Sequence, residues 1–211
     1  MTALDYKSAA EMLRFCADAI IRNKPFLTEV DAKIGDGDHG IGMALGMTNA
    51  KNALQAMTDC RDIYKIFSKF GTTMIMSMGG ASGVIFGTMF MGGAKGKEPA
   101  DSIHSKEFAN MMKDSLSAIK ARGKAEVGDK TMVDALEPAV DAMLTYGGNN
   151  FSEMFSLAEA AAKRGVEQTK QLTAKYGRAK FLGERSLGFP DAGATSVWII
   201  FRAMREFSEL Q

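Results

Sequence analysis

The sequence predicts an all-α fold in which residues 1–211 form a single domain. Apolar side chains recur at spacings of three and four along most of the chain, which is the period of an amphipathic helix. Strand-like stretches are few, and no alternation of strands with helices indicates a parallel sheet. The chain has 211 residues, of which 46% are hydrophobic, and this is enough to bury one compact core.

The helical period divides the chain into about eight segments, whose boundaries a single sequence leaves loose. The first spans residues 5–23, where the apolar positions are Ala9, Met12, Leu13, Cys16, Ala19 and Ile20. The pattern continues over 41–57, and further helices are expected over 62–77, 82–93, 105–121, 131–146, 152–175 and 193–209.

Two stretches resemble strands, namely F-L-T-E-V at 26–30 and V-W-I-I-F at 197–201. The second lies inside a longer helical period that ends in R-A-M-R-E-F, so we expect a helix there. Residues 26–30 stay open to either assignment.

The composition argues against several classes of protein. Lys and Arg number 26 against 25 Asp and Glu, and this balance does not indicate a nucleic-acid partner. Cys16 and Cys60 are too few and too far apart for a disulfide framework or a zinc site, so reduced thiols and a cytoplasmic location are expected. The charged N-terminus does not resemble a signal peptide.

One uncharged stretch, between Lys69 and Lys95, is long enough to span a bilayer. The pair Gly79-Gly80 interrupts it in the middle, where a helix would break. We therefore expect two buried segments joined by a glycine loop, and no membrane span.

Residues 34–40 read I-G-D-G-D-H-G and match the dinucleotide-binding pattern G-x-G-x-x-G. No convincing strand precedes them and two of them are acids, so we reject a dinucleotide-binding turn. Asp31, Asp36 and Asp38 cannot share one helix face, but they can converge in a glycine-bent loop. Three close carboxylates repel one another unless a cation neutralises them, and their hard oxygens suit Mg²⁺ or Ca²⁺ better than zinc. The alternative is a solvated turn.

Three other glycine-bearing loops precede predicted helices. M-G-G-A-S-G at 78–83 would expose N–H groups and the Ser82 hydroxyl to an anion, unless its small residues serve a close helix crossing. R-G-K-A-E-V-G-D-K-T-M at 122–132 has the glycine spacing of a P-loop, but Asp129 stands at the lysine position, so we reject a P-loop. The loop at 177–196 is either another phosphate-receiving helix start or a surface connection.

His39 lies beside the acids and is a candidate phosphate contact, whereas His104 receives no role. Taken together, the loops describe a nucleotide–Mg²⁺ site on a helical scaffold, in which acids bind cations and the cations bind phosphates.

The ordered motifs are G-D-G-D-H-G (35–40), G-G-A-S-G…F-G-T (79–88), R-G-K-A-x-x-G-D-K-T-M (122–132), G-R-A-x-x-L-G-E-R-S (177–186) and D-x-G-A-T-S (191–196). This set, spread over nearly the whole chain, resembles the nucleotide-binding L subunit of dihydroxyacetone kinase. The resemblance implies a barrel of eight antiparallel helices with the nucleotide site at one end.

The resemblance also implies a role for each matching position. His39 and Ser82 would be catalytic, and the metal ligands for two Mg²⁺ ions would be Asp31, Asp36 and Asp38. ADP or ATP would contact His39, Gly40, Ile41, Gly42, Ala81, Ser82, Gly123, Met132, Arg178, Asp191, Ala192 and Gly193. Two positions depart from the family pattern. Gly42 stands where many relatives carry Asn, which removes a polar contact near the phosphates, and Ala192 replaces a frequent Pro, which loosens the last turn.

The implied function is that of one subunit of a split kinase for a short-chain ketose such as dihydroxyacetone. A separate K subunit would hold the ketose, and a phosphohistidine on a phosphotransferase-system M subunit would rephosphorylate the bound ADP. A subunit of an ATP-dependent kinase for a ketose such as erythrulose is the alternative.

Three alternative functions remain: a fatty-acid kinase domain, a nucleotide-sensing module that binds a transcription regulator, and a helical bundle without ligand. His39 and the end of the chain at Gln211 disfavour the first. We expect a homodimer or hetero-oligomer, without nucleic-acid or membrane partners.

Overall fold

The computed structural model describes residues 1–211, and its ordered elements are almost all helical, which confirms the all-α prediction. A two-stranded antiparallel ribbon joins β1 (Ala3–Asp5) to β2 (Ser102–His104), with Leu4 opposite Ile103. The α-helices are α1 (Tyr6–Arg22), α2 (Lys24–Ala32), α3 (His39–Gln55), α4 (Ile63–Ser77), α5 (Gly80–Met91), α6 (Ser105–Gly123), α7 (Val133–Thr145), α8 (Phe151–Thr169) and α9 (Ala192–Glu209), and a 3-10 helix, η1, spans Arg178–Ser186.

The β1–β2 ribbon and η1 were not predicted, and two predicted segments differ from the structure. The strand-like residues 26–30 lie in α2, which Pro25 starts and which buries only Leu27 and Val30. Such a short helix has too few buried positions to display a period. The predicted helix over 152–175 ends at Thr169, because the carbonyl of Thr169 accepts a hydrogen bond from the Lys130 ammonium and the chain turns away there.

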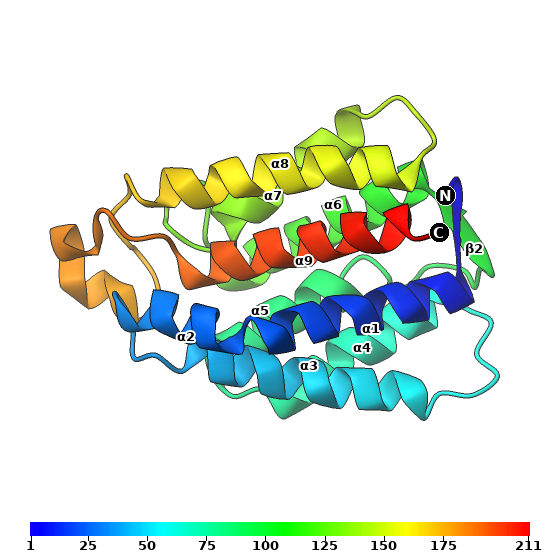
Figure 1. Ribbon diagram of the computed structural model, residues 1–211, viewed down its shortest axis with the longest axis horizontal. Helices are drawn as coiled ribbons and strands as arrows, with labels where there is room; N and C mark the ends of the chain where they lie inside the picture. The colour runs from blue at the N-terminus through cyan, green and yellow to red at the C-terminus, as the bar shows by residue number, and fades with distance from the viewer.

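Eight helices close into a ring, and this confirms the expected barrel. Each packs on the next in the order α1, α3, α4, α5, α6, α7, α8 and α9, and α9 packs back on α1. The short α2 lies outside the ring, against α3 and α9. The helices run along the long axis of the molecule, with both chain termini at one end (Figure 1). The loop between α2 and α3, η1 and the start of α9 lie together at the other end.

The interior of the ring is a cluster of 52 buried residues. Within this cluster the Phe108 ring meets Phe155, Phe151 and Phe67 edge-on, at centroid distances of 5.2, 5.8 and 6.0 Å. Burial of such large side chains is the dominant favourable term in folding. The core therefore holds the helices in the order that brings their loops to a common end.

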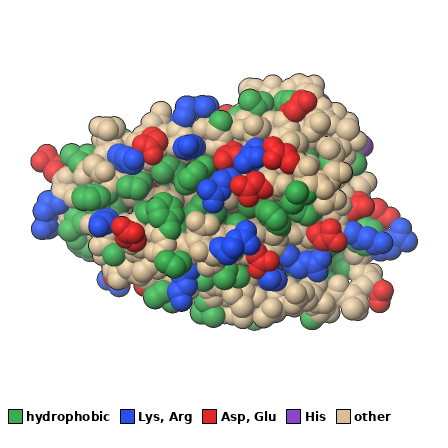
Figure 2. Space-filling model, viewed as in Figure 1, with side chains coloured by type: hydrophobic (Ala, Val, Ile, Leu, Met, Phe, Trp, Pro, Cys, Tyr) green, Lys and Arg blue, Asp and Glu red, His purple; other side chains and the backbone are tan.

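The uncharged stretch is divided as predicted, because α4 ends at Ser77 and α5 begins at Gly80. Gly71 and Gly87 let these two helices cross closely, since a Cβ at Gly71 would collide with the Gly87 carbonyl. None of the helices has the length and apolar character needed to cross a bilayer. On the face drawn in Figure 2, acidic and basic side chains alternate around apolar ones, without a one-sign stripe.

Candidate nucleotide and metal site

Three carboxylates converge in the turn between α2 and α3. Asp31 lies in the last turn of α2, Asp36 and Asp38 follow the helix, and one oxygen from each lies within 4.8 Å of the others. Gly37 makes the bend with φ +76°, in the left-handed region that favours glycine. The Asp31 carbonyl accepts a bond of 2.6 Å from the Gly35 N–H, which holds the turn against α2.

The electrostatics of this turn fit a divalent cation. Burial and then the negative charge of Asp36 raise the pKa of Asp38, so the three acids repel one another as they stand. Oxygen-only donors at this spacing suit a hard cation such as Mg²⁺. Arg178 offsets part of the charge, with its Nε 3.0 Å from Asp36 Oδ2. Both partners of this ion pair are exposed, so the pair itself contributes little to stability.

His39 is the first residue of α3 and joins the acids to α9. Its main-chain N–H donates to Asp31 Oδ2 at 3.2 Å, and its Nε2 lies 2.8 Å from Ser196 Oγ. Its ring packs on Phe86 of α5, with centroids 5.8 Å apart. Burial lowers the pKa of His39 more than the charge of Asp31 raises it, so the imidazole is neutral at pH 7.

The three residues after His39 sit in different surroundings. Gly40 is buried against α2, where a Cβ would collide with Thr28. Ile41 is 53% exposed. A Cβ at Gly42 would meet nothing within 4 Å. Packing therefore requires a glycine at position 40 but not at position 42.

The start of α5 lies next to this turn. Ala81 and Ser82 are exposed in its first turn, after Gly80, whose φ is +70°. Ser82 is one helical turn before Phe86, so it shares the helix face that packs on His39. Free N–H groups in a first helical turn attract anions.

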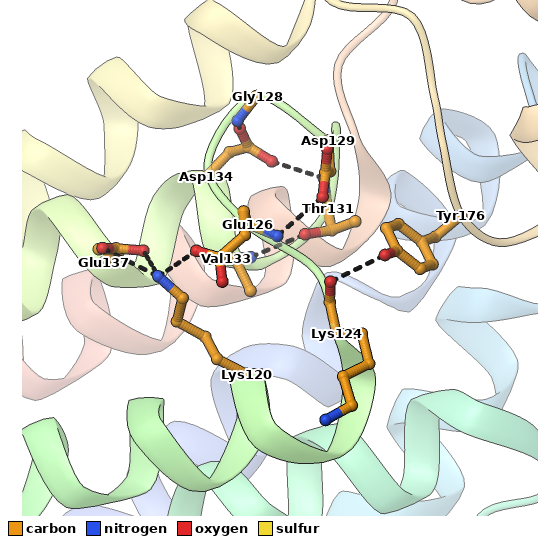
Figure 3. A network of polar contacts seen from close by, with 10 residues as sticks. All are labelled: Lys120, Lys124, Glu126, Gly128, Asp129, Thr131, Val133, Asp134, Glu137 and Tyr176. Atoms are coloured by element: carbon orange, nitrogen blue, oxygen red, sulfur yellow. Dashed lines mark hydrogen bonds and ion pairs between the residues drawn. The ribbon is translucent and has the colours of Figure 1, made fainter.

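The loop between α6 and α7 (residues 124–132) is held by its own acids (Figure 3). Asp134 accepts from the N–H groups of Gly128 and Thr131 at 2.6 and 2.7 Å, and Asp129 accepts from that of Glu126 at 2.8 Å. Asp134 and Asp129 are both buried. These bonds make the loop a fixed support for its neighbours rather than a loose connection.

The same region brings together the residues predicted to flank the base. A Cβ at Gly123 would lie 3.2 Å from Ile85 of α5. A Cβ at Gly193 would lie 3.3 Å from that of Met132, which is buried. Gly123 and Met132 therefore link the α6–α7 loop to the starts of α5 and α9.

Asp191 caps α9, because its Oδ2 accepts from the Ala194 N–H at 2.7 Å. Burial raises the pKa of Asp191 to about 7. Ala192 is buried at the first position of the helix. Pro is favoured at that position, but Ala also fits it without strain, so the Ala192 departure leaves α9 intact.

The predicted residues thus lie in five segments that meet at one end of the barrel. Sequence reasoning gave no role to three residues that connect these segments: Lys130, Asp134 and Ser196. All three are buried polar side chains: Lys130 and Ser196 lie inside quoted motifs, and Asp134 lies two residues after one. A charged residue between two glycine-bearing motifs was the available signal, but its burial depends on the tertiary fold.

The family model of the DAK2 domain matches residues 33–206 of this chain. Over 191 residues the chain is 37% identical to the ADP-binding subunit DhaL of the PEP-dependent dihydroxyacetone kinase of Escherichia coli (strain K12), covering 90% of each. It is 34% identical over 189 residues to the ADP-binding subunit DhaL of the PTS-dependent dihydroxyacetone kinase of Lactococcus lactis, covering 90% of this chain and 91% of that one.

The fold also resembles a solved structure. The dihydroxyacetone kinase from C. freundii in complex with AMP-PNP and Mg²⁺ superimposes with a TM-score of 0.73 at 26% identity, over 94% of this chain and 33% of that one. The chain therefore spans about a third of the length of that kinase. On the match to residues 33–206 and the identities along nine tenths of its length, this chain belongs to the DAK2 domain family and, within it, to the nucleotide-binding L subunits of dihydroxyacetone kinases.

Proposed function

We propose that residues 1–211 act as one unit, the ADP-binding subunit of a dihydroxyacetone kinase. It would relay a phosphoryl group from a phosphohistidine on an M subunit to dihydroxyacetone held on a separate K subunit. The observation that carries the proposal is the group of three carboxylates within 4.8 Å, set among helix starts in a chain that matches ADP-binding subunits along 90% of its length.

We assign Asp31, Asp36 and Asp38 as the ligands of two Mg²⁺ ions. Bound with its cations, the nucleotide supplies the phosphoryl group, and the cations neutralise the charge on its phosphates. The carboxylates contribute by fixing those cations, and Arg178 contributes the one guanidinium that the structure places against them. Phosphoryl transfer needs positioning and charge neutralisation more than covalent catalysis, and this site offers both.

His39 and Ser82 would face the transferred group from two helices. Ser196 orients the His39 ring through a hydrogen bond of 2.8 Å, and a neutral imidazole can donate a hydrogen bond without adding positive charge. Ser82 offers a hydroxyl at the start of α5, beside the N–H of Ala81. Gly40, Ile41 and Gly42 would line the phosphates from the first turn of α3.

The base would lie between the α6–α7 loop and the start of α9. Gly123 and Met132 form one wall, and the turn from Asp191 through Ala192 to Gly193 forms the other, with Gly193 packed on Met132. An apolar wall with few polar groups is typical of a pocket for a planar base.

A partner subunit is supported by apolar side chains around this end. Large apolar residues exposed there are Ile41, Met76, Val127, Phe181, Leu187 and Phe189, with exposures from 37% for Phe189 to 82% for Met76. Such a rim is costly to leave in water and marks a protein–protein contact. We assign it to the K subunit, because the ketose must reach the phosphoryl group at this end. We place the complex in the cytoplasm, where the free thiols of Cys16 and Cys60 remain reduced.

The test is to purify the chain without added nucleotide, denature it with and without prior chelation, and identify the released nucleotide. Near-stoichiometric ADP that is lost on removal of Mg²⁺ supports a retained cofactor. The purified chain should then support dihydroxyacetone phosphorylation only with K and phosphorylated M subunits. Turnover driven by ATP, or preferring erythrulose, would replace the donor or the ketose in this proposal. Failure to bind either nucleotide would refute it.

A further inference from the structure

Lys130 is among the largest fully buried side chains of the protein, with 2% of its surface exposed. A buried ammonium is costly unless all its donors find acceptors. Lys130 Nζ satisfies this condition, since it lies 2.7 Å from the Thr169 carbonyl, 2.9 Å from that of Ser186 and 2.7 Å from that of Phe189. An ammonium has three donors, so none remains for a ligand.

The three acceptors belong to one stretch of chain, residues 169–190, which we call the cover segment. Thr169 ends α8 where the segment begins, Ser186 is the last residue of η1, and Phe189 lies three residues later, shortly before α9. Gly188 N–H also donates to the Lys170 carbonyl at 2.8 Å, and Asp191 N–H to Thr169 Oγ1 at 2.9 Å. Lys130 thus joins the first residue of the cover segment to two carbonyls near its end.

The first half of the cover segment is attached to the same loop that carries Lys130. Lys175 Nζ pairs with Asp129 Oδ1 at 2.6 Å, and its N–H donates to the Asp129 carbonyl at 3.1 Å. Tyr176 donates its hydroxyl to the Lys124 carbonyl at 2.8 Å (Figure 3). The 3-10 helix η1 is therefore fastened to the α6–α7 loop just before its first residue, Arg178, and again at its last, Ser186.

We infer that Lys130, with Lys175 as a second anchor, is a positioning residue for the nucleotide site: it fastens the cover segment to the α6–α7 loop and so holds Arg178 against the carboxylates of the α2–α3 turn. Arg178 itself is 75% exposed and has no packing that would otherwise keep it there. The inference rests on the proposed function, since it concerns the same site.

The charges around Lys130 agree with a fixed cation. Burial lowers the pKa of Lys130, and the carboxylates of Asp191 and Asp134 oppose that change. Its acceptor on Thr169 is a carbonyl at the C-terminus of α8, the negative end of the helix dipole. Replacing Lys130 by an apolar side chain would leave the Ser186 and Phe189 carbonyls without this donor, while the Thr169 carbonyl keeps the Leu172 N–H. The two carbonyls would recover partners most cheaply by moving into water.

The test compares Lys130→Met with Lys175→Met, and uses Lys170→Met as the matched control. Lys170 lies in the same segment, but its ammonium pairs only with Glu167 one turn earlier in the chain. Two quantities are measured on the full chain: the dissociation constant of Mg²⁺–ADP, and hydrogen exchange of the amides of η1 against those of α1.

We expect Lys130→Met to weaken Mg²⁺–ADP binding by about tenfold or more, the factor typical of one hydrogen bond to a charged group. Exchange of the η1 amides should rise in Lys130→Met and less in Lys175→Met, while exchange in α1 stays as in the wild type. The control should match the wild type in both measurements.

Unchanged ADP affinity and unchanged η1 exchange in Lys130→Met would overturn the inference. Faster exchange in both η1 and α1 would also overturn it, because exchange that rises throughout the protein marks a general loss of stability. If Lys130→Met does not fold, Lys175→Met tests the inference, since the Lys175 side chain is 64% exposed and contributes little to the core. Unchanged η1 exchange in Lys175→Met would overturn the inference. Absence of ADP binding by the wild type would instead refute the proposed function.

Discussion

The substitution Asp36→Asn separates a cation site from a solvated turn, because only a cation site makes the response to Mg²⁺–ADP depend on this carboxylate. Two unit charges 4.8 Å apart repel by about 0.9 kcal/mol even in water. Asp36 takes part in two such pairs, with Asp31 and Asp38, so its neutralisation removes about 2 kcal/mol of repulsion. The exposed ion pair with Arg178 that is lost at the same time is worth about 1 kcal/mol at most.

The chelated variant should therefore be about 1 kcal/mol more stable than the wild type, which raises the Tm of a chain of this length by about 2–4 °C. Mg²⁺–ADP at a hundred times its Kd should stabilise the wild type by about 2.7 kcal/mol, or about 5–11 °C, and the variant much less. Thermal melts followed by circular dichroism in chelator and in Mg²⁺–ADP measure both effects.

The matched control is Asp101→Asn, which breaks a similar exposed pair with Arg61 at 3.0 Å outside the cluster. It should lower Tm slightly in chelator and keep the full response to Mg²⁺–ADP. The reasoning is refuted if Asp36→Asn lowers Tm in chelator as Asp101→Asn does, and if its response to Mg²⁺–ADP equals that of the wild type.

Three further predictions concern the support of the site. The pKa of Asp191 stands at about 7 against an ordinary 3.8, so the folded state keeps a proton that the unfolded chain releases, and stability should fall as pH rises from about 4 to about 7. Asp191→Asn keeps the cap on α9 and removes this loss. The free energy of unfolding of the variant should therefore exceed that of the wild type at pH 8 by at most about 4 kcal/mol, and by less at pH 5. An equal difference at both pH values would contradict the assignment. Gly165→Ala should destabilise the protein by about 1–3 kcal/mol in urea titrations, because the new Cβ would lie 2.8 Å from Ala135 Cα and closer still to the Asp134 carbonyl. Unchanged stability would mean that α7 and α8 can separate at no cost. Phe108→Ala removes a fully buried ring from the core and should cost about 3–5 kcal/mol in the same titrations. The affinity for Mg²⁺–ADP should stay unchanged in the fraction that remains folded, and a selective loss of affinity would place Phe108 in the site.

Local pattern was enough to predict most helices, because a period of three to four residues is a property of neighbouring positions. It failed for α2, where a nine-residue helix buries only Leu27 and Val30. It also ran α8 past Thr169, where the chain is stopped by a hydrogen bond from Lys130, a residue 39 positions earlier in the sequence. In α2 the local signal was too short to read, and at Thr169 a tertiary contact outweighed it.

The candidate site divides in the same way. The convergence of Asp31, Asp36 and Asp38 could be expected from the sequence, since a short glycine-bent loop has few other ways to arrange the acids in it and beside it. The contacts of His39 with Ser196 and of Arg178 with Asp36 join residues 157 and 142 positions apart, and no local pattern contains them. They exist because eight helices close into a ring and bring their loops to one end.

By itself, then, the sequence determined which segments are helical and which loop gathers negative charge, because both follow from the order of side chains over a few turns of chain. Only the tertiary structure decided which charges are buried. Asp191 acquires its raised pKa, and Lys130 its three carbonyl partners, from helices that are distant in the chain. The physical reason is that desolvation depends on everything packed around a group, and that packing is complete only when the barrel closes.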